Sequence, residues 1–88
     1  MTNKEVITNE LNKLGFELGC YDSQLDKASK KTIKDLLWYL KEDATDVDVK
    51  IGRKLYVVEI NTVDGEKDLN VLSKEEYIEC YGSSRWED

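Results

Sequence analysis

Residues 46–72 read DVDVKIGRKLYVVEINTVDGEKDLNVL, and two tight turns within this stretch decide the fold. Gly52-Arg53 suits a two-residue turn of type II′, and Asp64-Gly65 is a strong signal for a turn of type I′. The flanking segments alternate apolar and polar side chains, which is typical of half-buried strands. We therefore expect an antiparallel meander of three strands, spanning residues 46–51, 55–62 and 67–72.

The two turns also set the strand register, and they agree with each other. If Ile51 lies opposite Lys54 and Val63 lies opposite Glu66, eight apolar side chains from all three strands lie on one face. A slip of one residue at either turn would destroy this agreement. The predicted apolar face consists of Val47, Val49, Ile51, Tyr56, Val58, Ile60, Leu69 and Val71.

Two helices are expected before the meander. Thr2-Asn3-Lys4-Glu5 has the form of a capping box and opens a helix over residues 3–14, which Gly15 ends. A second helix is expected over residues 24–41, with Ser23 as its N-cap. Its apolar stripe has helical spacing and consists of Ile33, Leu36, Leu37 and Leu40, with Trp38 and Tyr39 covering its borders.

The remaining segments complete the expected architecture. Residues 16–18 are a brief extended piece that either pairs with a sheet edge or crosses it. Residues 73–76 form another capping box, which predicts a short helix ending at Gly82. The fold class is thus α+β in the order ααβββα, with the helices covering the apolar sheet face. We expect one domain over residues 1–82 and a flexible tail over residues 83–88.

Composition narrows the classes of function. The chain has 88 residues, of which 40% are hydrophobic, and it has no proline and no histidine. The absence of histidine removes the usual general base and the commonest metal ligand, so we expect neither catalysis nor a cofactor nor a metal. No long apolar segment or secretion signal is present, which favours the cytoplasm and predicts free thiols at Cys20 and Cys80.

The negative charge is concentrated in the second half of the chain. Residues 1–41 carry seven basic and six acidic side chains, whereas residues 42–88 carry six basic and thirteen acidic ones. Such a polarised field repels nucleic acid and anionic membranes from the acidic half, and it attracts basic surfaces.

The meander register places carboxylates together on its outer face. Asp46 lies opposite Glu59, and Asp48 and Asp68 share that face. Like charges in such positions destabilise a sheet. Residues that lower stability without a structural benefit are candidates for a functional role, so we consider these carboxylates as binding residues. The alternatives are a merely solvated face or a cation site, although no D-x-D-x-D-G loop is present.

Two other features allow different interpretations. Lysines 27, 30, 31 and 34 have helical spacing, and they form either a solvated helix face or a weak phosphate-binding surface. Trp86 either folds back on the core or anchors a partner. A second functional hypothesis is therefore a regulatory or structural interaction module with an apolar surface formed by Leu55, Val57, Leu72 and Trp86.

The acidic residues of this compact chain resemble those of small phage-encoded DNA mimics, the host-takeover and anti-defence proteins that occlude a host factor's nucleic-acid site. Such proteins inhibit histone-like HU proteins, RNA polymerase or CRISPR effectors. The resemblance implies a non-enzymatic inhibitor in the host cytoplasm that binds a basic nucleic-acid-binding protein and does not itself bind nucleic acid. The lysine row departs from this pattern, and it could pair with the acids of a second copy in a two-fold dimer. The implied partner-binding residues are Glu42, Asp43, Asp46, Asp48, Glu59, Asp64, Glu66 and Asp68.

Overall fold

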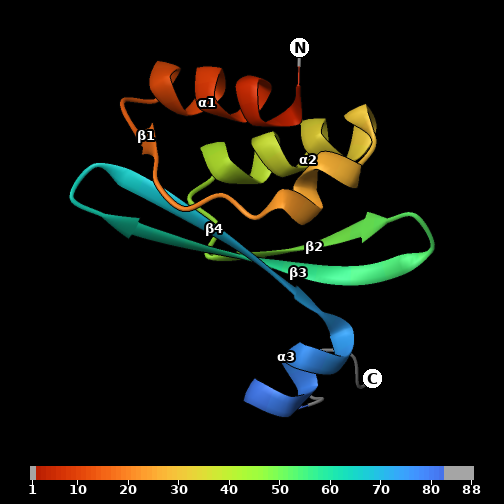
Figure 1. Ribbon diagram of the computed structural model, residues 1–88. Coiled ribbons are helices and arrows are strands. Elements are labelled where there is room, and N and C mark those ends of the chain that lie inside the picture. Colours follow the sequence, from red (N-terminus) through yellow and green to blue (C-terminus); the bar gives the residue numbers. More distant parts are fainter. Residues whose placement is uncertain (1, 83–88) are drawn as a thin grey trace.

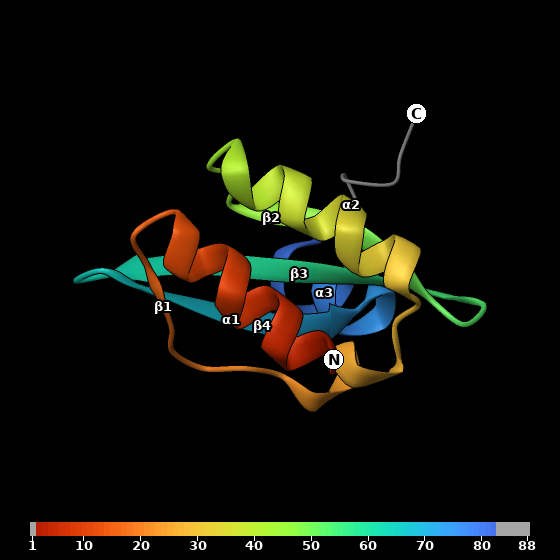
Figure 2. The ribbon, with the colours of Figure 1, turned by 90° about the horizontal axis from the view of Figure 1, so that it is seen from above.

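The computed structural model describes residues 2–82, which form an α+β fold built on a mixed four-stranded sheet. The elements are helix α1 (Asn3–Lys13), strand β1 (Glu17–Leu18), the 3-10 helix η1 (Ser23–Lys27), helix α2 (Lys30–Lys41), strands β2 (Asp46–Ile51), β3 (Lys54–Val63) and β4 (Glu66–Ser73), and helix α3 (Lys74–Tyr81). The sheet order is β1-β4-β3-β2. Helices α1 and α2 lie side by side on one face of the sheet, and α3 lies on the other (Figures 1 and 2).

The predicted meander and its register are confirmed. Val47 pairs with Val58 across β2 and β3, and Ile60 pairs with Leu69 across β3 and β4. The β3–β4 turn has φ angles of 46° at Asp64 and 83° at Gly65, as a type I′ turn requires. The two turns therefore act together, as the sequence indicated, to place the predicted apolar residues of the three strands on one face.

The main core lies between this apolar face and helices α1 and α2. Valine, isoleucine and leucine side chains of the meander pack there against Ile7 and Leu11 of α1 and Leu36 and Leu40 of α2. All of these side chains are buried, and Tyr56 on the same face of the meander is half-buried. Burying such aliphatic side chains contributes roughly 1.5–3 kcal/mol each, so this layer supplies most of the stability.

Helix α1 begins as predicted, but the predicted second helix is divided. Thr2 and Glu5 form the expected capping box, and Glu5 has a pKa below its usual value because it accepts the Thr2 backbone N–H. Residues 23–41 do not form one helix with Ser23 as N-cap. Asp22 caps η1, Ala28 is extended with a ψ of 147°, and Ser29 caps α2.

A buried contact explains why the chain breaks at this point. The Asn3 side chain is buried, and its Nδ2 donates to the carbonyl oxygens of Leu25 at 2.7 Å and Ala28 at 3.0 Å. Leu25 lies within η1 and Ala28 directly follows it; a continuous helix would have bonded both carbonyl groups to its own amides. The Asn3 side chain, at the start of α1, therefore supplies hydrogen bonds to carbonyl groups at the end of η1. Because the contact joins residues far apart in the sequence, local periodicity could not reveal it.

The brief extended segment pairs with the sheet and does not merely cross it. Strand β1 runs parallel to β4, so the sheet is mixed and has four strands, not the three of an antiparallel meander. The Glu17 amide donates to Gly65 O and the Gly19 amide donates to Lys67 O, each at 2.9 Å. A parallel partner requires a long crossover, and here α2, β2 and β3 supply it.

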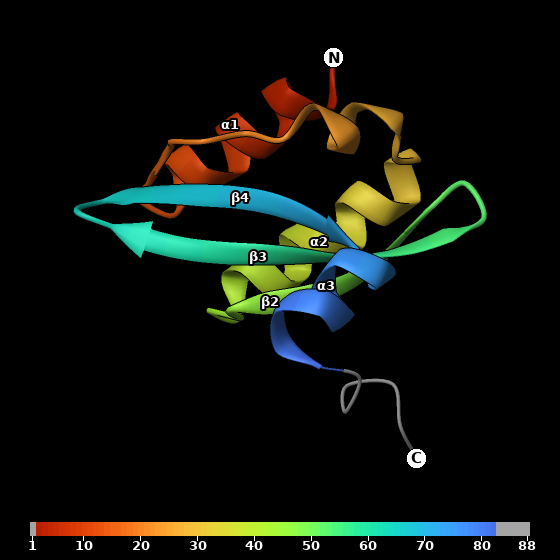
Figure 3. The ribbon, with the colours of Figure 1, turned by 60° about the horizontal axis from the view of Figure 1, so that its bottom comes forward.

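Helix α3 begins with the predicted Ser73 and Glu76 capping box, but it lies on the face opposite to the one expected (Figure 3). The outer face of the sheet carries apolar side chains at Leu55, Val57 and Leu72, among the acids. Val57 is fully buried although it points away from the main core. Helix α3 packs against β3 and β4 and shields these side chains from water, which is the physical reason for its position.

Candidate acidic binding surface

Strands β2 and β3 bring three carboxylates together at one end of the outer face. Asp46 is the direct partner of Glu59, and Asp48 follows two residues later on β2. Asp48 is exposed, while Asp46 and Glu59 are half-buried. Same-face residues lie roughly 6.6 Å apart along a strand and about 4.8 Å apart across strands, so these three side chains form a compact group of negative charge.

Helix α3 borders this group and contacts one of its members. The Tyr81 hydroxyl donates a hydrogen bond of 3.0 Å to Glu59 Oε2. This hydrogen bond, together with the negative charge of Glu59, raises the pKa of Tyr81 above its usual value. Glu59 therefore has a defined orientation beside α3.

The same helix removes most of the apolar surface that the second hypothesis needs. Val57 is fully buried, and Leu55 and Leu72 are half-buried. These three side chains pack between α3 and the sheet, so they are less accessible to a partner than the second hypothesis requires. The fourth predicted anchor, Trp86, and the predicted tail over residues 83–88 lie outside the described residues.

Asp68 has a structural contact within the fold. Its Oδ1 accepts the backbone amide of Cys20 at 2.9 Å, just beyond the end of β1. Gly19 permits this contact, because a Cβ at that position would clash with the same carboxylate oxygen. Asp22 makes the same kind of contact, because its Oδ2 accepts the backbone N–H of Val71 at 3.2 Å. These acids satisfy amides beside the short strand β1, so Asp68 contributes less to an open acidic surface than its register suggests.

Glu42 and Asp43 lie at the end of α2, away from the outer-face group. Glu42 caps the helix, and Asp43 adopts a left-handed φ of 58°. Asp43 Oδ1 lies 3.5 Å from Nζ of Lys67, whose side chain is only 3% exposed. The positive charge of Lys67 therefore offsets one of the two acids that oppose the dipole of α2.

Lys67 itself was missed by sequence reasoning. Its ammonium group donates to Thr62 Oγ1 at 2.9 Å and lies 4.4 Å from the centroid of the Phe16 ring. The predicted register already placed Lys67 on the inner face of β4. A lysine on that face is normally expected to reach solvent at the edge of the sheet, so its burial was not expected. The contacts with Asp43 and Phe16 depend on the tertiary structure.

The remaining predicted acids, Asp64 and Glu66, lie at the tip of the β3–β4 hairpin, and both are exposed. The tip extends beyond the helices at one end of the sheet (Figure 1). The eight predicted residues therefore do not form one continuous site. They divide into the outer-face group (Asp46, Asp48 and Glu59), the hairpin tip, the end of α2, and the structurally engaged Asp68.

The lysine row is also divided. Lys27 belongs to η1, whereas Lys30, Lys31 and Lys34 belong to α2, so the expected single basic helix face does not form. Lys30 Nζ donates to the Asn3 side-chain oxygen at 3.1 Å, which gives it a contact at the junction of the helices. These observations weaken the case for a phosphate-binding helix face.

Trp38 and Tyr39 are more exposed than expected for residues that cover the borders of a core. Trp38 is 58% exposed and Tyr39 is 43% exposed. Their rings pack edge to face, with centroids 5.1 Å apart. The sequence signal was the apolar run over residues 36–40, which contains more apolar side chains than one helix stripe can bury.

Other kinds of site find little support in residues 2–82. This part of the chain has no group of three or more histidine, cysteine or acidic side chains arranged to hold a metal ion. Cys20 and Cys80 are both exposed free thiols. None of the described helices has the length and apolar character that crossing a bilayer requires.

Comparisons with known proteins supply no family to which the chain can be assigned. No protein-family model, curated protein or solved structure matches it.

Proposed function

We propose that this protein is a non-enzymatic binding protein whose acidic surface occupies the nucleic-acid-binding surface of a basic protein. The single observation that carries the proposal is the group formed by Asp46, Asp48 and Glu59 on two neighbouring strands. Inhibition of the basic protein follows if the carboxylates prevent nucleic acid from reaching it. This is the mode of action of the small DNA mimics that the sequence resembles.

The energetics of the group support a role in recognition. Asp46 and Glu59 are directly opposite each other, an arrangement that costs a sheet some tenths of a kcal/mol. Aspartate is also a poor strand former. A pair of asparagine or threonine residues would keep the strands together without this cost, so we attribute the carboxylates to binding.

The charge distribution also supports a basic partner. The spacing of Asp46 and Asp48 along β2, roughly 6.6 Å, is similar to two steps of about 3.4 Å along one DNA strand. The exposed acids at the hairpin tip extend the negative field along the sheet. Exposed charges of this kind increase the association rate by steering, and salt screens their effect within about 8 Å at physiological ionic strength.

Affinity capture from a bacterial lysate tests the proposal. The wild-type protein should retain a nucleic-acid-binding protein that added duplex DNA displaces. The triple variant Asp46→Asn, Asp48→Asn, Glu59→Gln should bind that protein about tenfold more weakly, because each exposed pair is worth roughly 0.5 kcal/mol. Its free energy of unfolding should not fall, since the like-charge repulsion is also removed.

A matched control separates local from overall charge. The variant Glu10→Gln, Glu75→Gln, Glu79→Gln changes the net charge by the same amount, but its substitutions lie on helices α1 and α3. It should retain the partner as well as the wild type does. Equal retention by both triple variants, or retention that duplex DNA does not reduce, would exclude mimicry by the outer face.

A further inference from the structure

Helix α2 presents an aromatic pair to solvent beside the acidic edge strand. Trp38, at 58% exposure, and Tyr39, at 43%, pack edge to face on this helix. Exposing a tryptophan leaves a large apolar surface in contact with water, and tryptophan is among the residues that contribute most to protein interfaces. The chemistry around Trp38 indicates what kind of group would cover it.

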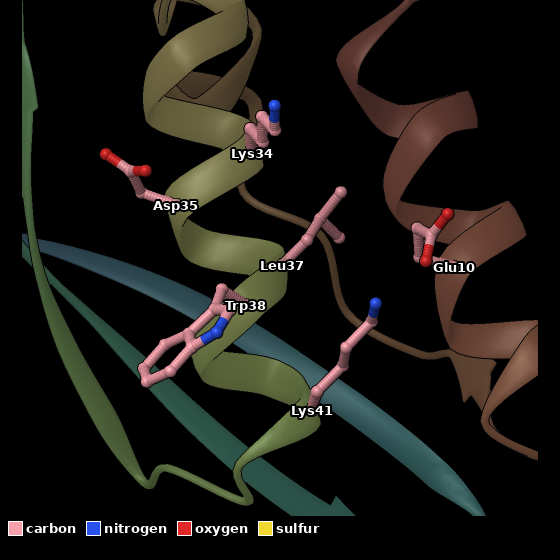
Figure 4. Close-up of a pocket in the computed structure, with 6 residues that line it drawn as sticks. All are labelled: Glu10, Lys34, Asp35, Leu37, Trp38 and Lys41. Atoms are coloured by element: carbon pink, nitrogen blue, oxygen red, sulfur yellow. The ribbon is translucent and has the colours of Figure 1, made fainter.

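Carboxylates border this aromatic surface. A cavity of about 400 Å³ between α2 and β2 is lined by Asp35, Trp38, Tyr39 and Asp48. Asp35 and Trp38 are three residues apart on the helix, and their side chains extend to the same side of it (Figure 4). Asp48 comes from the neighbouring edge strand, so acidic side chains continue from the outer face of the sheet around β2 to α2.

We propose that this cavity binds the guanidinium group of an arginine side chain on the basic partner, an inference that rests on the proposed function. An indole face attracts a cation, and a guanidinium group stacks on it as a flat plane. Carboxylates accept its N–H donors, and they repel phosphate and carboxylate groups. An ammonium group can use the charges, but it lacks the flat surface for stacking.

The groove on the other side of Trp38 does not have this preference. It is lined by Glu10, Lys34, Asp35, Leu37, Trp38 and Lys41, so it combines two lysines with two carboxylates. Leu37 and Lys41 point from α2 toward α1, away from the side on which Asp35 lies (Figure 4). Farther along the groove between α2 and β2, Lys31 and Lys50 join the lining. The arrangement that selects a cation is therefore confined to the part of this groove beside Trp38 and Tyr39.

Hexa-arginine, hexalysine and hexaglutamate peptides are suitable probes, with binding measured by titration calorimetry at low salt. We expect saturable binding of hexa-arginine, about tenfold weaker binding of hexalysine, and no binding of hexaglutamate. In a Trp86→Phe background, Trp38 is the sole tryptophan, and its fluorescence should change with hexa-arginine at the same concentrations.

Trp38→Ala should weaken hexa-arginine binding about tenfold and reduce the preference for arginine over lysine. Leu14→Ala is the control, because Leu14 also leaves a large apolar side chain exposed, at 39%, and lies at the end of α1, outside the acidic groups; it should bind as the wild type does. Asp35→Asn should weaken both cationic peptides by a similar factor. Circular dichroism confirms that each variant remains folded.

The outcomes separate this inference from the proposed function. Equal hexa-arginine affinity in Trp38→Ala and Leu14→Ala would overturn the arginine site, even if the outer-face triple variant loses the lysate partner. A lysate partner unaffected by the triple variant and by duplex DNA would overturn the proposed function instead. Equal affinity for hexa-arginine and hexalysine would show attraction of charge without guanidinium recognition, and it would also exclude the site.

Discussion

The two faces of the sheet use the same strands for different purposes. The inner face, under α1 and α2, buries most of the side chains that it presents, including that of Lys67. The outer face buries Val57 under a short helix and leaves carboxylates such as Asp48 in water. Because β2, β3 and β4 contribute to both faces, alternation along each strand separates a layer that stabilises the fold from a layer available for binding. Substitutions on the two faces should therefore have different effects.

Two leucines on β4 provide the most direct test of this difference. Leu69 is fully buried on the inner face, whereas Leu72 is half-buried on the outer face beside Val57. Leu69→Ala should lower the free energy of unfolding by about 3 kcal/mol, and Leu72→Ala by only about 1 kcal/mol. Urea denaturation measures both values. Similar losses would mean that α3 and the outer face contribute as much to stability as the main core does.

The buried charge on the inner face should have the next largest effect. Lys67→Ala removes the hydrogen bond to Thr62, the contact with Phe16 and the aliphatic packing of the lysine stem, at an expected cost of about 2 kcal/mol. Asp43→Asn removes the other half of the ion pair. It should cost less than about 0.5 kcal/mol, because the Asp43 side chain is 86% exposed.

Thermal unfolding monitored by circular dichroism compares the two variants at pH 7. A loss in Asp43→Asn as large as that in Lys67→Ala would contradict the view that packing and the Thr62 hydrogen bond dominate at Lys67. Lys67→Met, which keeps the length of the side chain without the charge, should fall between them.

The smallest effect is expected at Tyr81, where α3 meets Glu59. A pKa raised above the usual 10.0 means that the protonated hydroxyl is favoured in the folded state. The hydrogen bond from the Tyr81 hydroxyl therefore contributes fully to stability below pH 10, and this contribution is lost as the pH rises through the higher, folded-state pKa. Tyr81→Phe should therefore be slightly less stable than the wild type at pH 7, and the difference should disappear at strongly alkaline pH.

Parallel thermal melts from pH 7 to pH 11 reveal this convergence. Tyr39→Phe is a suitable control, because Tyr39 is 43% exposed and lies on α2, on the opposite side of the sheet from α3 (Figure 1). A difference between Tyr81→Phe and the wild type that is constant across this range would contradict a role for the hydroxyl proton.

The meander was predictable in detail because its turns and its alternation carry the same information. Asp64-Gly65 fixes a φ pattern, and that turn fixes the register of every residue in β3 and β4. The capping boxes at Thr2 and Ser73 were equally clear, because each depends on side chains within four residues of sequence. Local chemistry thus determines these elements without help from the rest of the chain.

The elements that sequence reasoning missed depend on distant contacts. The break before α2 requires Asn3, and the pairing of β1 requires the carbonyl oxygens of Gly65 and Lys67. The position of α3 follows from Val57, whose burial away from the main core became evident only with the tertiary structure. For the candidate site, the register located the acids correctly, but it could not show that Asp68 and Asp43 have partners within the fold.

The parallel pairing of β1 with β4 has a consequence for the order of assembly during synthesis. Residues 17 and 18 reach the ribosome exit well before residues 66 and 67, their partners in the sheet. The amino-terminal helices consequently have no completed surface to pack on until translation has passed β4. We expect a nascent chain halted before that strand to remain sensitive to protease, and the released chain to fold in one cooperative step.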